Sequence, residues 1–447
     1  MPLFKKGSKL QPGNYRPVSI LSVLSKILER AVHIQFTEYL TKRDLMYEHQ
    51  SGFRGKYSTG TCLIGLSDFI KGEVNKGNLV GLVLMDLQKA FDTVNHDVLL
   101  RKLSAIGVDS TTWFRSYLSG RSQCVEVEGT RSSFEDIGCG VPQGSILGPL
   151  LFLVYVNDMH LSVNCHLSLY ADDSVLIFSH SNPEVIRDKL SLELSNCRDW
   201  LIENRLSLHM GKTECILFGT GHRLGRVADF HISCAGCVIN PVTAVKYLGL
   251  TLDQRLKFTD HAKEVMKRCA GRLAFSYRQS AFLNFHCRRL LCNALVQPYL
   301  DYCSTAWYSS LTVDMKRKYD VIQRRMVRFV DSKDRLHHVS TTDLLNLSWL
   351  SFPDRVKFFK LVQLFKIRIG KAPSYLSSNF VPLSGRHTHE TRRKSFNYSI
   401  SRELSNSQSS FAYTTIKHWN ELPTDLQKIT SLETFKSRLK QFLFSSY

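Results

Sequence analysis

Hydrophobic residues follow two patterns along the chain, and the change between them divides it. The run from residue 79 to residue 85 is almost continuously apolar and predicts a strand that is buried on both faces. Two further apolar runs flank the adjacent acids Asp172 and Asp173, which predicts a tight hairpin with both carboxylates at its tip. From residue 261 onward, apolar residues recur at helical spacing. The pattern therefore predicts a mixed α+β region followed by a helical one.

The same patterns predict the remaining elements. Helices are expected at 22–39, 58–76, 94–105, 146–156, 184–203, 261–279, 286–295 and 314–330. Strands are expected at 214–218, in a hairpin of 123–127 with 134–137, and in a second hairpin of 230–239 with 242–253. The polar interval 384–410, rich in Ser and Arg, predicts a loop or linker. No apolar run reaches the roughly 18 residues that are needed to span a bilayer.

The net charge of the chain indicates a binding partner. The 447 residues include 59 Lys and Arg against 39 Asp and Glu, which gives a net charge of +20. A positive excess of this size indicates a nucleic-acid partner. An anionic membrane surface is the competing explanation, but no single amphipathic basic helix is expected to concentrate the charge. The length suits two or three domains.

The 12 cysteines indicate a reducing compartment. They follow no disulfide-framework spacing and no signal peptide is visible, which predicts free thiols. Cys234 and Cys237 form the one CxxC pair of the sequence. A second pair at zinc-finger spacing is absent, so we do not expect a metal site there.

Three acids are the candidate chemical centre. Adjacent carboxylates such as Asp172 and Asp173 repel each other and raise each other's pKa unless a cation lies against them. A hard divalent cation such as Mg²⁺ is the usual partner, and a solvated turn is the alternative. Asp86 follows the buried run 79–85, a position where a charge needs a partner or ligand. Two-metal nucleotidyl transfer requires carboxylates on adjacent strands in this way.

Basic or glycine-containing loops surround these acids in the sequence. The loops at 5–17 and 50–56 are basic, which suits phosphate contact, and solvated surface loops are the alternative. The loop 140–145 contains two glycines that allow close approach of the backbone to a ligand. Ser145 is predicted to cap the helix that follows.

Seven short motifs connect these features. In order, they are NYRPVS at 14–19, QSGFR at 50–54, DLQKAFD at 86–92, GVPQGSILGP at 140–149, YADD at 170–173, GKT at 211–213 and KYLG at 246–249. Each motif alone is weak, but seven in this order are specific. From its first residues to about residue 255, the sequence resembles the reverse transcriptase domain of non-LTR, LINE-type retrotransposons of the jockey-like kind. The helical remainder resembles the thumb and C-terminal region of the same elements.

The resemblance implies an α+β right-hand polymerase fold with an antiparallel palm sheet, and a division into domains. Residues 1–78 would be the fingers, 79–254 the palm with the catalytic motifs and a primer-grip hairpin, and 255–335 a helical thumb. Residues 336–447 would be a helical C-terminal region with a polar linker near 384–410. The endonuclease that usually precedes the polymerase in this family is not represented, and the fingers are expected to be incomplete at their N-terminus.

The resemblance also implies roles for individual residues. Asp86, Asp172 and Asp173 would be the catalytic carboxylates that hold two Mg²⁺ ions, with Mn²⁺ as the alternative metal. Lys212 would be catalytic as a proton donor to pyrophosphate, unless it is simply a solvated charge. The residues that would contact the incoming nucleotide are Lys5 (or Lys6), Arg16, Phe91, Gln143 and Gly144, although Phe91 could instead belong to the core. The hairpin with Tyr247, Leu248 and Gly249 would grip the primer end.

The function implied is that of an RNA-directed DNA polymerase, which uses dNTPs to extend a DNA primer or target DNA on an RNA template. One alternative is a catalytically inactive, nucleic-acid-binding fragment. Another is an RNA-dependent RNA polymerase or a maturase-like protein. Phe91 disfavours the RNA polymerase, because ribonucleotides need room at that position. The family implies a nuclear or cytoplasmic location without membrane partners, and the sequence indicates no oligomeric state.

Overall fold

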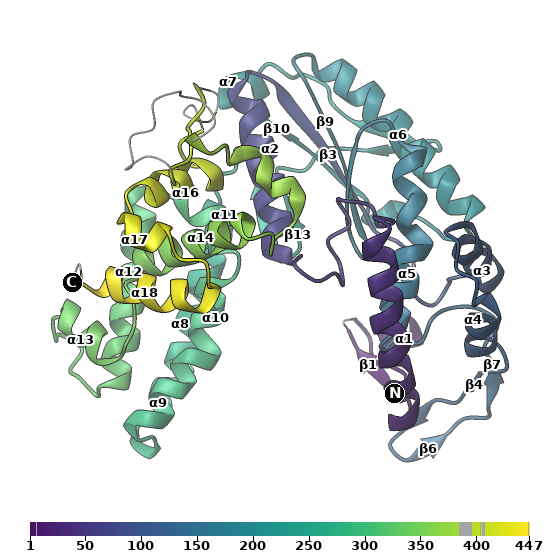
Figure 1. Cartoon of the computed structure of the whole chain (residues 1–447), viewed down its shortest axis with the longest axis horizontal. Helices are drawn as coiled ribbons and strands as arrows, with labels where there is room; N and C mark the ends of the chain where they lie inside the picture. The colour runs from purple at the N-terminus through teal and green to yellow at the C-terminus, as the bar shows by residue number, and fades with distance from the viewer. Residues whose placement is uncertain (6, 384–395, 403, 405–406, 446) are drawn as a thin grey trace.

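The computed structural model describes residues 1–5, 7–383, 396–402, 404, 407–445 and 447. The chain forms an arch, with the N-terminus on one arm and the C-terminus on the other (Figure 1). One arm contains α1 (Val23–Lys42), α3 (His96–Ala105), α4 (Thr111–Leu118) and α5 (Gly148–Val156). The other arm contains the helices from α8 (Thr259–Arg278) to α18 (Leu432–Phe444). The predicted order of the two regions, an α+β region followed by a helical one, is confirmed.

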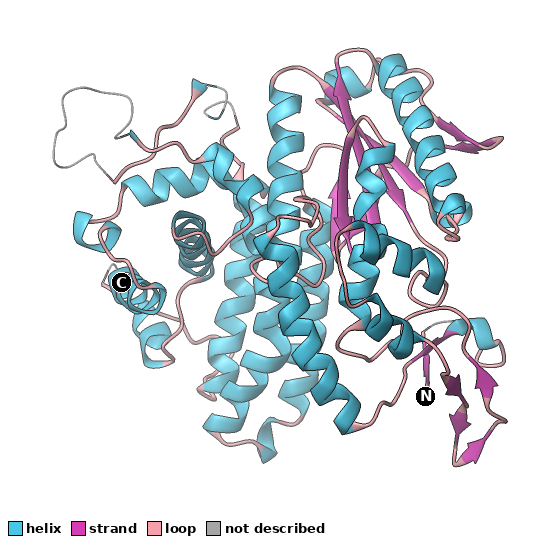
Figure 2. Cartoon of the chain, turned by 45° about the vertical axis from the view of Figure 1, so that its right-hand side comes forward, coloured by secondary structure: helices cyan, strands magenta, loops and turns pink. Residues whose placement is uncertain are grey.

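A four-stranded antiparallel sheet stands between the two arms, with helices on either side of it (Figure 2). Its strand order is β10 (Glu214–Phe218), β3 (Leu79–Met85), β9 (Asp173–His180) and β8 (His166–Tyr170). The bounds of β3 and β10 are those that the hydrophobic runs predicted. The hairpin of β8 and β9 is also confirmed, and its turn places Ala171 in the left-handed region at φ 56°.

The central strand β3 is buried on both faces, as its continuous apolar run predicted. Val80 and Leu82 face a core that includes helix α2 (Thr59–Asn75), while Val83 faces a second core on the side of α6 (Pro183–Glu203). A Cβ atom on Gly81 would lie only 2.4 Å from a side-chain carbon of Ile186 in α6. Glycine at this position therefore allows α6 to pack closely on the strand.

Two predicted hairpins differ from the structure. Residues 230–239 and 242–253 do not pair with each other, because each segment closes on itself: β11 (Ile232–Cys234) pairs with β12 (Cys237–Ile239), and β13 (Ala244–Tyr247) pairs with β14 (Leu250–Asp253). Each pair is joined by two residues with positive φ that end in glycine, which is the geometry that tight hairpins require. The hairpin at 122–137 forms as two short ladders, β4 (Ser122–Gln123) with β7 (Glu135–Asp136) and β5 (Glu126–Val127) with β6 (Thr130–Arg131).

Helix α1 presents its apolar stripe to solvent. Leu24, Ile27 and Leu28, whose spacing predicted the helix, are 79%, 62% and 55% exposed. The buried side instead contains Glu29 and Phe36. Periodicity predicted the helix correctly but did not indicate which face is covered.

The helices after residue 255 agree with the predicted spacing. Helix α8 and helix α12 (Val313–Val330) match the predictions, and the predicted helix 286–295 is α9 (Phe285–Leu291) followed by a π-helical turn, Cys292–Val296. Helix α12 is amphipathic and carries six of the 59 basic residues of the chain: Lys316, Arg317, Lys318, Arg324, Arg325 and Arg328. None of the helices in the described ranges is long and apolar enough to cross a membrane.

The later helices share one hydrophobic core with the sheet. Buried residues of α2, α8, α12, α14 (Phe352–Arg368), α16 (Phe411–Asn420) and α18 form one cluster together with Val175 and Ile177 of β9. The arm with α1 and α3 to α5 packs with α6 and the opposite face of the sheet in a second cluster. Residues 384–395 of the predicted linker lie outside the described residues.

Candidate active site

The strand register brings the three predicted acids to one end of the sheet. Met85 of β3 is paired with Ser174 of β9, so Asp86 and Asp173 are the next residues on two neighbouring antiparallel strands. Asp172 precedes Asp173 in the turn of the β8–β9 hairpin. Residues opposite each other on neighbouring strands have their Cβ atoms roughly 5 Å apart. Asp86 and Asp173, which are 87 positions apart in the sequence, thus become neighbours.

Removal from water, together with the proximity of the other acids, raises the pKa values of two of these carboxyl groups. Partial removal from water, with repulsion by Asp172 and Asp86, raises the pKa of Asp173 to about 6. The pKa of Asp172 is also raised, chiefly by its removal from water and partly by the charge of Asp86. Arg16 and Lys5 act in the opposite direction on Asp172. The site therefore holds negative charge that a cation would relieve.

The two cations that lower the pKa of Asp172 are supplied by an N-terminal hairpin. Strand β1 (Pro2–Phe4) pairs with β2 (Tyr15–Pro17), with Leu3 opposite Arg16. The amide of Lys5 donates to the carbonyl oxygen of Asn14 at 2.8 Å and continues this ladder. Both predicted phosphate contacts thus come from one hairpin and are exposed. Lys6, the alternative to Lys5, lies outside the described residues.

Lys212 is exposed and forms an ion pair with an acid of the site. Its Nζ donates to Oδ2 of Asp86 at 2.9 Å, and the two side chains are 54% and 39% exposed. The 3₁₀ turn Met210–Lys212 immediately precedes β10, which pairs with β3, and this places the lysine beside the end of β3. The amide of His209 donates to the carbonyl oxygen of Asp86 at 2.8 Å and anchors the turn.

The chemistry of these residues fits a divalent cation. Carboxylate oxygens are the ligands that Mg²⁺ prefers, and repulsion among them is relieved when a cation binds. Within the described part of the chain, no three His, Cys, Asp or Glu side chains are already gathered as a metal site. The carboxylate of Asp86 lies against Lys212 instead. A cation at this position would therefore compete with Lys212 for Asp86.

The glycine-containing loop at 140–145 joins two other motifs. Gln143 donates from Nε2 to Oδ1 of Asp92 at 2.8 Å, and its carbonyl oxygen accepts from the amide of Ser19 at 2.7 Å. Gly144 has φ +116°, and a Cβ atom there would lie 2.7 Å from the carbonyl oxygen of Ser19. Only glycine fits this combination of φ and close approach. These contacts hold three of the motifs together as one surface: 14–19, 86–92 and 140–149.

Phe91 belongs partly to the core and partly to that surface. Its ring stacks on Phe152, with centroids 4.4 Å apart and an angle of 28°, and meets the edge of Phe53 at 6.2 Å. Phe152 is fully buried, whereas Phe53 is 58% exposed. The ring of Phe91 is thus fixed between the interior and the site.

The predicted primer-grip residues divide into two groups. Tyr247 is only 2% exposed, and its hydroxyl lies 3.7 Å from Sγ of Cys62 inside the core, so this side chain supports the hairpin from within. Leu248 and Gly249 form the turn. Tyr302, which the sequence did not indicate, donates its hydroxyl to the carbonyl oxygen of Leu248 at 2.6 Å.

Gln50 is a second residue that the sequence analysis missed. We predicted a basic surface loop at 50–56, but Gln50 is fully buried. Its Oε1 accepts from the amides of Gly52 at 2.9 Å and Ala171 at 3.0 Å, and so holds the turn before Asp172. A Cβ atom on Gly52 would lie 2.4 Å from the nitrogen of Ala171. The glycine two positions after Gln50 was the one signal for this close contact.

Glu29 is the third such residue, and it supports the loop that carries Gln143. This carboxylate is 2% exposed and accepts from the amide of Ile146 at 2.6 Å and that of Leu147 at 3.3 Å. Negative charge is favourable at the beginning of a helix such as α5. Oγ of Ser145 also accepts from the amide of Gly148 at 2.9 Å, but α5 begins at Gly148 and its N-cap residue is Leu147, so Ser145 contacts the first turn without being the predicted cap.

Comparisons with known proteins agree with this geometry. Residues 4–252 match the family model described as reverse transcriptase (RNA-dependent DNA polymerase). The probable RNA-directed DNA polymerase from transposon BS of Drosophila melanogaster is 30% identical over 342 residues, which are 71% of this chain and 36% of the relative. The RNA-directed DNA polymerase from mobile element jockey of the same organism is 30% identical over 65% of this chain and 32% of the relative. The chain thus spans about a third of the length of these relatives.

Among solved structures, telomerase from Candida tropicalis in complex with a fragment of telomeric RNA covers 95% of this chain and 57% of its own chain. The identity is 13% and the TM-score is 0.41. At this TM-score, the similarity supports no conclusion about the chain.

Proposed function

This chain belongs to the reverse transcriptase family, and on that premise we propose that it is the RNA-directed DNA polymerase of a LINE-type retrotransposon. Its fold is accordingly the α+β right-hand polymerase fold. One observation carries the proposal. Asp86, Asp172 and Asp173 lie at one end of the sheet, within electrostatic reach of Arg16 and close to Lys212.

We assign the parts of the hand as fingers at 1–78, palm at 79–254, thumb at 255–335 and a C-terminal region at 336–447. The four-stranded sheet supports the assignment of the palm, and the shift to helices after β14 supports that of the thumb. Helix α12 presents six basic residues in the thumb, which suits contact with the phosphates of a primer–template duplex.

The acids and the lysine beside them would have separate roles in nucleotide addition. Asp86, Asp172 and Asp173 would hold two Mg²⁺ ions, with Mn²⁺ as the alternative. Such ions, when bound, polarise the attacking 3′-hydroxyl and neutralise charge on the leaving pyrophosphate. Lys212, freed from Asp86, would donate a proton to that pyrophosphate.

The dNTP would be bound by the hairpin and loop that flank the acids. Arg16 and Lys5 supply positive charge for the triphosphate, and the surface that Gln143 and Gly144 form with Ser19 meets the base and template. The fixed ring of Phe91 would exclude a 2′-hydroxyl and so favour deoxynucleotides. The turn of Leu248 and Gly249 would hold the primer end. We place the protein where it can reach chromosomal DNA, in the nucleus after synthesis in the cytoplasm.

Primer extension tests this function. Purified protein given poly(rA)/oligo(dT), dTTP and Mg²⁺ should incorporate dTMP, and Asp172→Ala with Asp173→Ala should reduce the rate by about a hundredfold or more. The matched control is Asp188→Ala with Asp199→Ala, which removes two exposed acids of α6 that pair with the neighbouring Arg187 and Arg198. Incorporation that survives the first double change contradicts the proposal. Salt-sensitive RNA binding without synthesis at any Mg²⁺ concentration would support the inactive alternative.

A further inference from the structure

A short segment of the chain extends the palm sheet beside the turn that carries Asp172 and Asp173. The amide of Ser51 donates to the carbonyl oxygen of Leu169 at 2.8 Å, and the amide of Leu169 donates to that of His49 at 3.0 Å. The side chain of Gln50 accepts from the amide of Ala171 at 3.0 Å. Leu169 belongs to β8 and Ala171 to the turn itself. Residues 49–51 therefore hold the backbone of the turn from one side.

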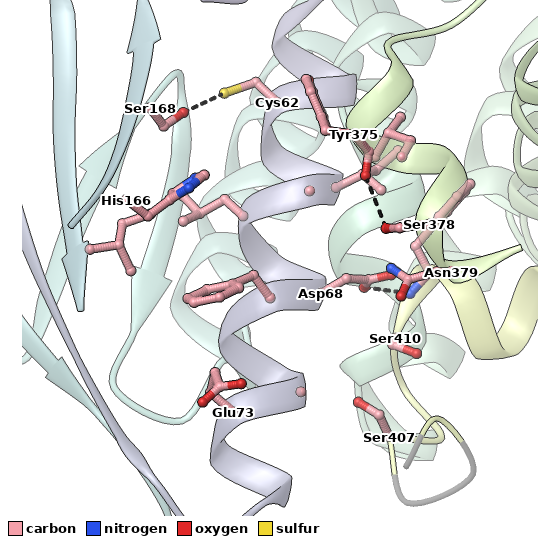
Figure 3. Close-up of a pocket in the computed structure, with 18 of the residues that line it drawn as sticks. Cys62, Asp68, Glu73, His166, Ser168, Tyr375, Ser378, Asn379, Ser407 and Ser410 are labelled. Atoms are coloured by element: carbon pink, nitrogen blue, oxygen red, sulfur yellow. Dashed lines mark hydrogen bonds between the residues drawn. The ribbon is translucent and has the colours of Figure 1, made fainter. Parts of the chain in front are cut away.

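A residue of the C-terminal region contacts this segment. The hydroxyl of Tyr375, in the 3₁₀ helix η7 (Ser374–Asn379), lies 3.2 Å from Oγ of Ser51. Its ring stacks on that of His49, with centroids 5.3 Å apart and an angle of 24°. The preceding Ser374 donates to Glu48 at 2.8 Å. Figure 3 shows Tyr375 beside α2, in the wall of a cavity of about 310 Å³.

A glycine in helix α2 is independent evidence for the position of the Tyr375 ring. Gly65 lies inside this helix, where glycine is destabilising relative to alanine. A Cβ atom at this position would lie 3.0 Å from Cε2 and 3.4 Å from Cδ2 of Tyr375. The missing side chain thus makes room for the Tyr375 ring.

We propose that Tyr375 is a positioning residue for the polymerase centre: it holds residues 49–51 against β8 and thereby fixes the turn that carries Asp172 and Asp173. The inference rests on the proposed function, because a fixed turn matters for catalysis only if these acids hold the metal. Tyr375 lies beyond residues 4–252, which match the family model. The C-terminal region would thus contribute to the geometry of the catalytic site without touching substrate.

Tyr375→Phe removes the hydroxyl that faces Ser51 and keeps the ring in its place. We expect kcat to fall about threefold to tenfold, which corresponds to the loss of one net hydrogen bond. The Mg²⁺ concentration at half-maximal rate should rise, because the carboxylates are less well held. Affinity for the primer–template should not change. Gly65→Ala places a methyl group against the Tyr375 ring. It should also lower kcat and raise the Mg²⁺ concentration at half-maximal rate.

Tyr398→Phe is the matched control. Tyr398 is also a buried tyrosine of the C-terminal region, but its ring packs on Phe380 and Trp419, away from residues 49–51. This control should leave kcat and the Mg²⁺ requirement unchanged. Ser51→Ala combined with Tyr375→Phe should be no worse than either single change, since both remove the same contact. An active protein in which Tyr375→Phe matches the unchanged chain overturns the inference.

Hydrogen exchange gives a second measurement that does not need activity. In Tyr375→Phe, amides at 169–174 should exchange faster than in the unchanged protein or in Tyr398→Phe. Equal exchange there, or faster exchange throughout the chain, overturns the inference. An unchanged protein that shows no synthesis counts against the proposed function alone, and exchange still decides whether Tyr375 holds the turn.

Discussion

Lys212 and Asp86 form an ion pair at the edge of the candidate active site, and this pair determines what each side chain can do. Half-exposed pairs contribute only about 0–1 kcal/mol, so a cation or a phosphate group can separate them. The 2.9 Å contact therefore keeps Lys212 close to the reacting groups without locking it in place. The pairing could not be read from the sequence, because it joins residues next to the ends of two strands, β3 and β10, that become neighbours only in the sheet.

Lys212→Met should have two effects on polymerisation. Methionine cannot compete for Asp86, so the Mg²⁺ concentration at half-maximal rate should fall. It also cannot donate a proton, so kcat should fall about a hundredfold. Primer extension across a Mg²⁺ series measures both. The control is Lys42→Met, which breaks an exposed ion pair with Glu38 on α1. A higher Mg²⁺ requirement in Lys212→Met would contradict the competition.

Phe91→Ala should relax the choice between nucleotides. The Phe91 ring is fixed by stacking on Phe152, and its removal leaves room for a 2′-hydroxyl. We expect the ratio of ribonucleotide to deoxynucleotide incorporation to rise at least about tenfold. Competition between rNTP and dNTP on one primer–template measures this ratio. Phe69→Ala, which removes a ring of α2 that stacks on His166, should leave it unchanged.

At the scale of elements, local signals were sufficient to find most strands and helices. Helices α6, α8 and α12 begin and end within two residues of the predicted bounds, because their apolar residues keep a regular period. The pairing of strands was harder to predict. The β11–β12 and β13–β14 segments were expected to pair with each other, but tight turns within each segment decided otherwise. The turns at 235–236 and 248–249 end in glycine and have the positive φ that tight hairpins require, whereas Asn240 and Pro241 between the two segments do not.

Helix α14 carries a lysine where helices meet. Lys360 is 1% exposed and donates to Oγ of Ser309 at 2.5 Å and to the hydroxyl of Thr414 in α16. Burial, with smaller contributions from the charges of Lys71 and Lys316, lowers the pKa of Lys360 to about 7, and Asp68 acts against this change.

Lys360→Met should therefore change how stability depends on pH. The folded state binds fewer protons than the unfolded state between pH about 7 and about 10.5, so the unchanged protein should gain stability as pH rises through this window. The variant should lack that gain, and its stability relative to the unchanged protein should be highest below pH 7. Denaturant unfolding at pH 6.5 and pH 9.5 measures the difference. Lys366→Met, a less buried lysine of the same helix, is the control. An equal pH response in both variants would refute the prediction.

At the scale of the molecule, the C-terminal helices complete the core of the sheet. Leu63 and Ile70 of α2 share one cluster with Phe365, Trp419 and Phe435. Asp68 also accepts from the amides of Phe411 and Ala412 at the start of α16. Although the C-terminal region was predicted as a separate part of the chain, it covers one side of α2.

A chain that ends at residue 351 should therefore fold poorly. Removal of α14, α16 and α18 would expose the apolar side of α2 that these helices cover. We expect aggregation, or loss of a cooperative thermal transition by circular dichroism, in conditions where the full chain remains soluble and folded. A soluble, cooperatively folded product with the melting temperature of the full chain would show that the C-terminal helices are dispensable for folding.

The sequence alone determined the family of this protein, the candidate acids and most of the elements. The three acids, the basic charge, the ordered motifs and the hydrophobic periods are all local properties, so they can be read residue by residue. Only the tertiary structure decided which distant residues meet: Lys212 with Asp86, Gln50 with Ala171, and Tyr375 with Ser51. Such contacts depend on how strands pair and helices pack across many residues, and no local pattern records that arrangement.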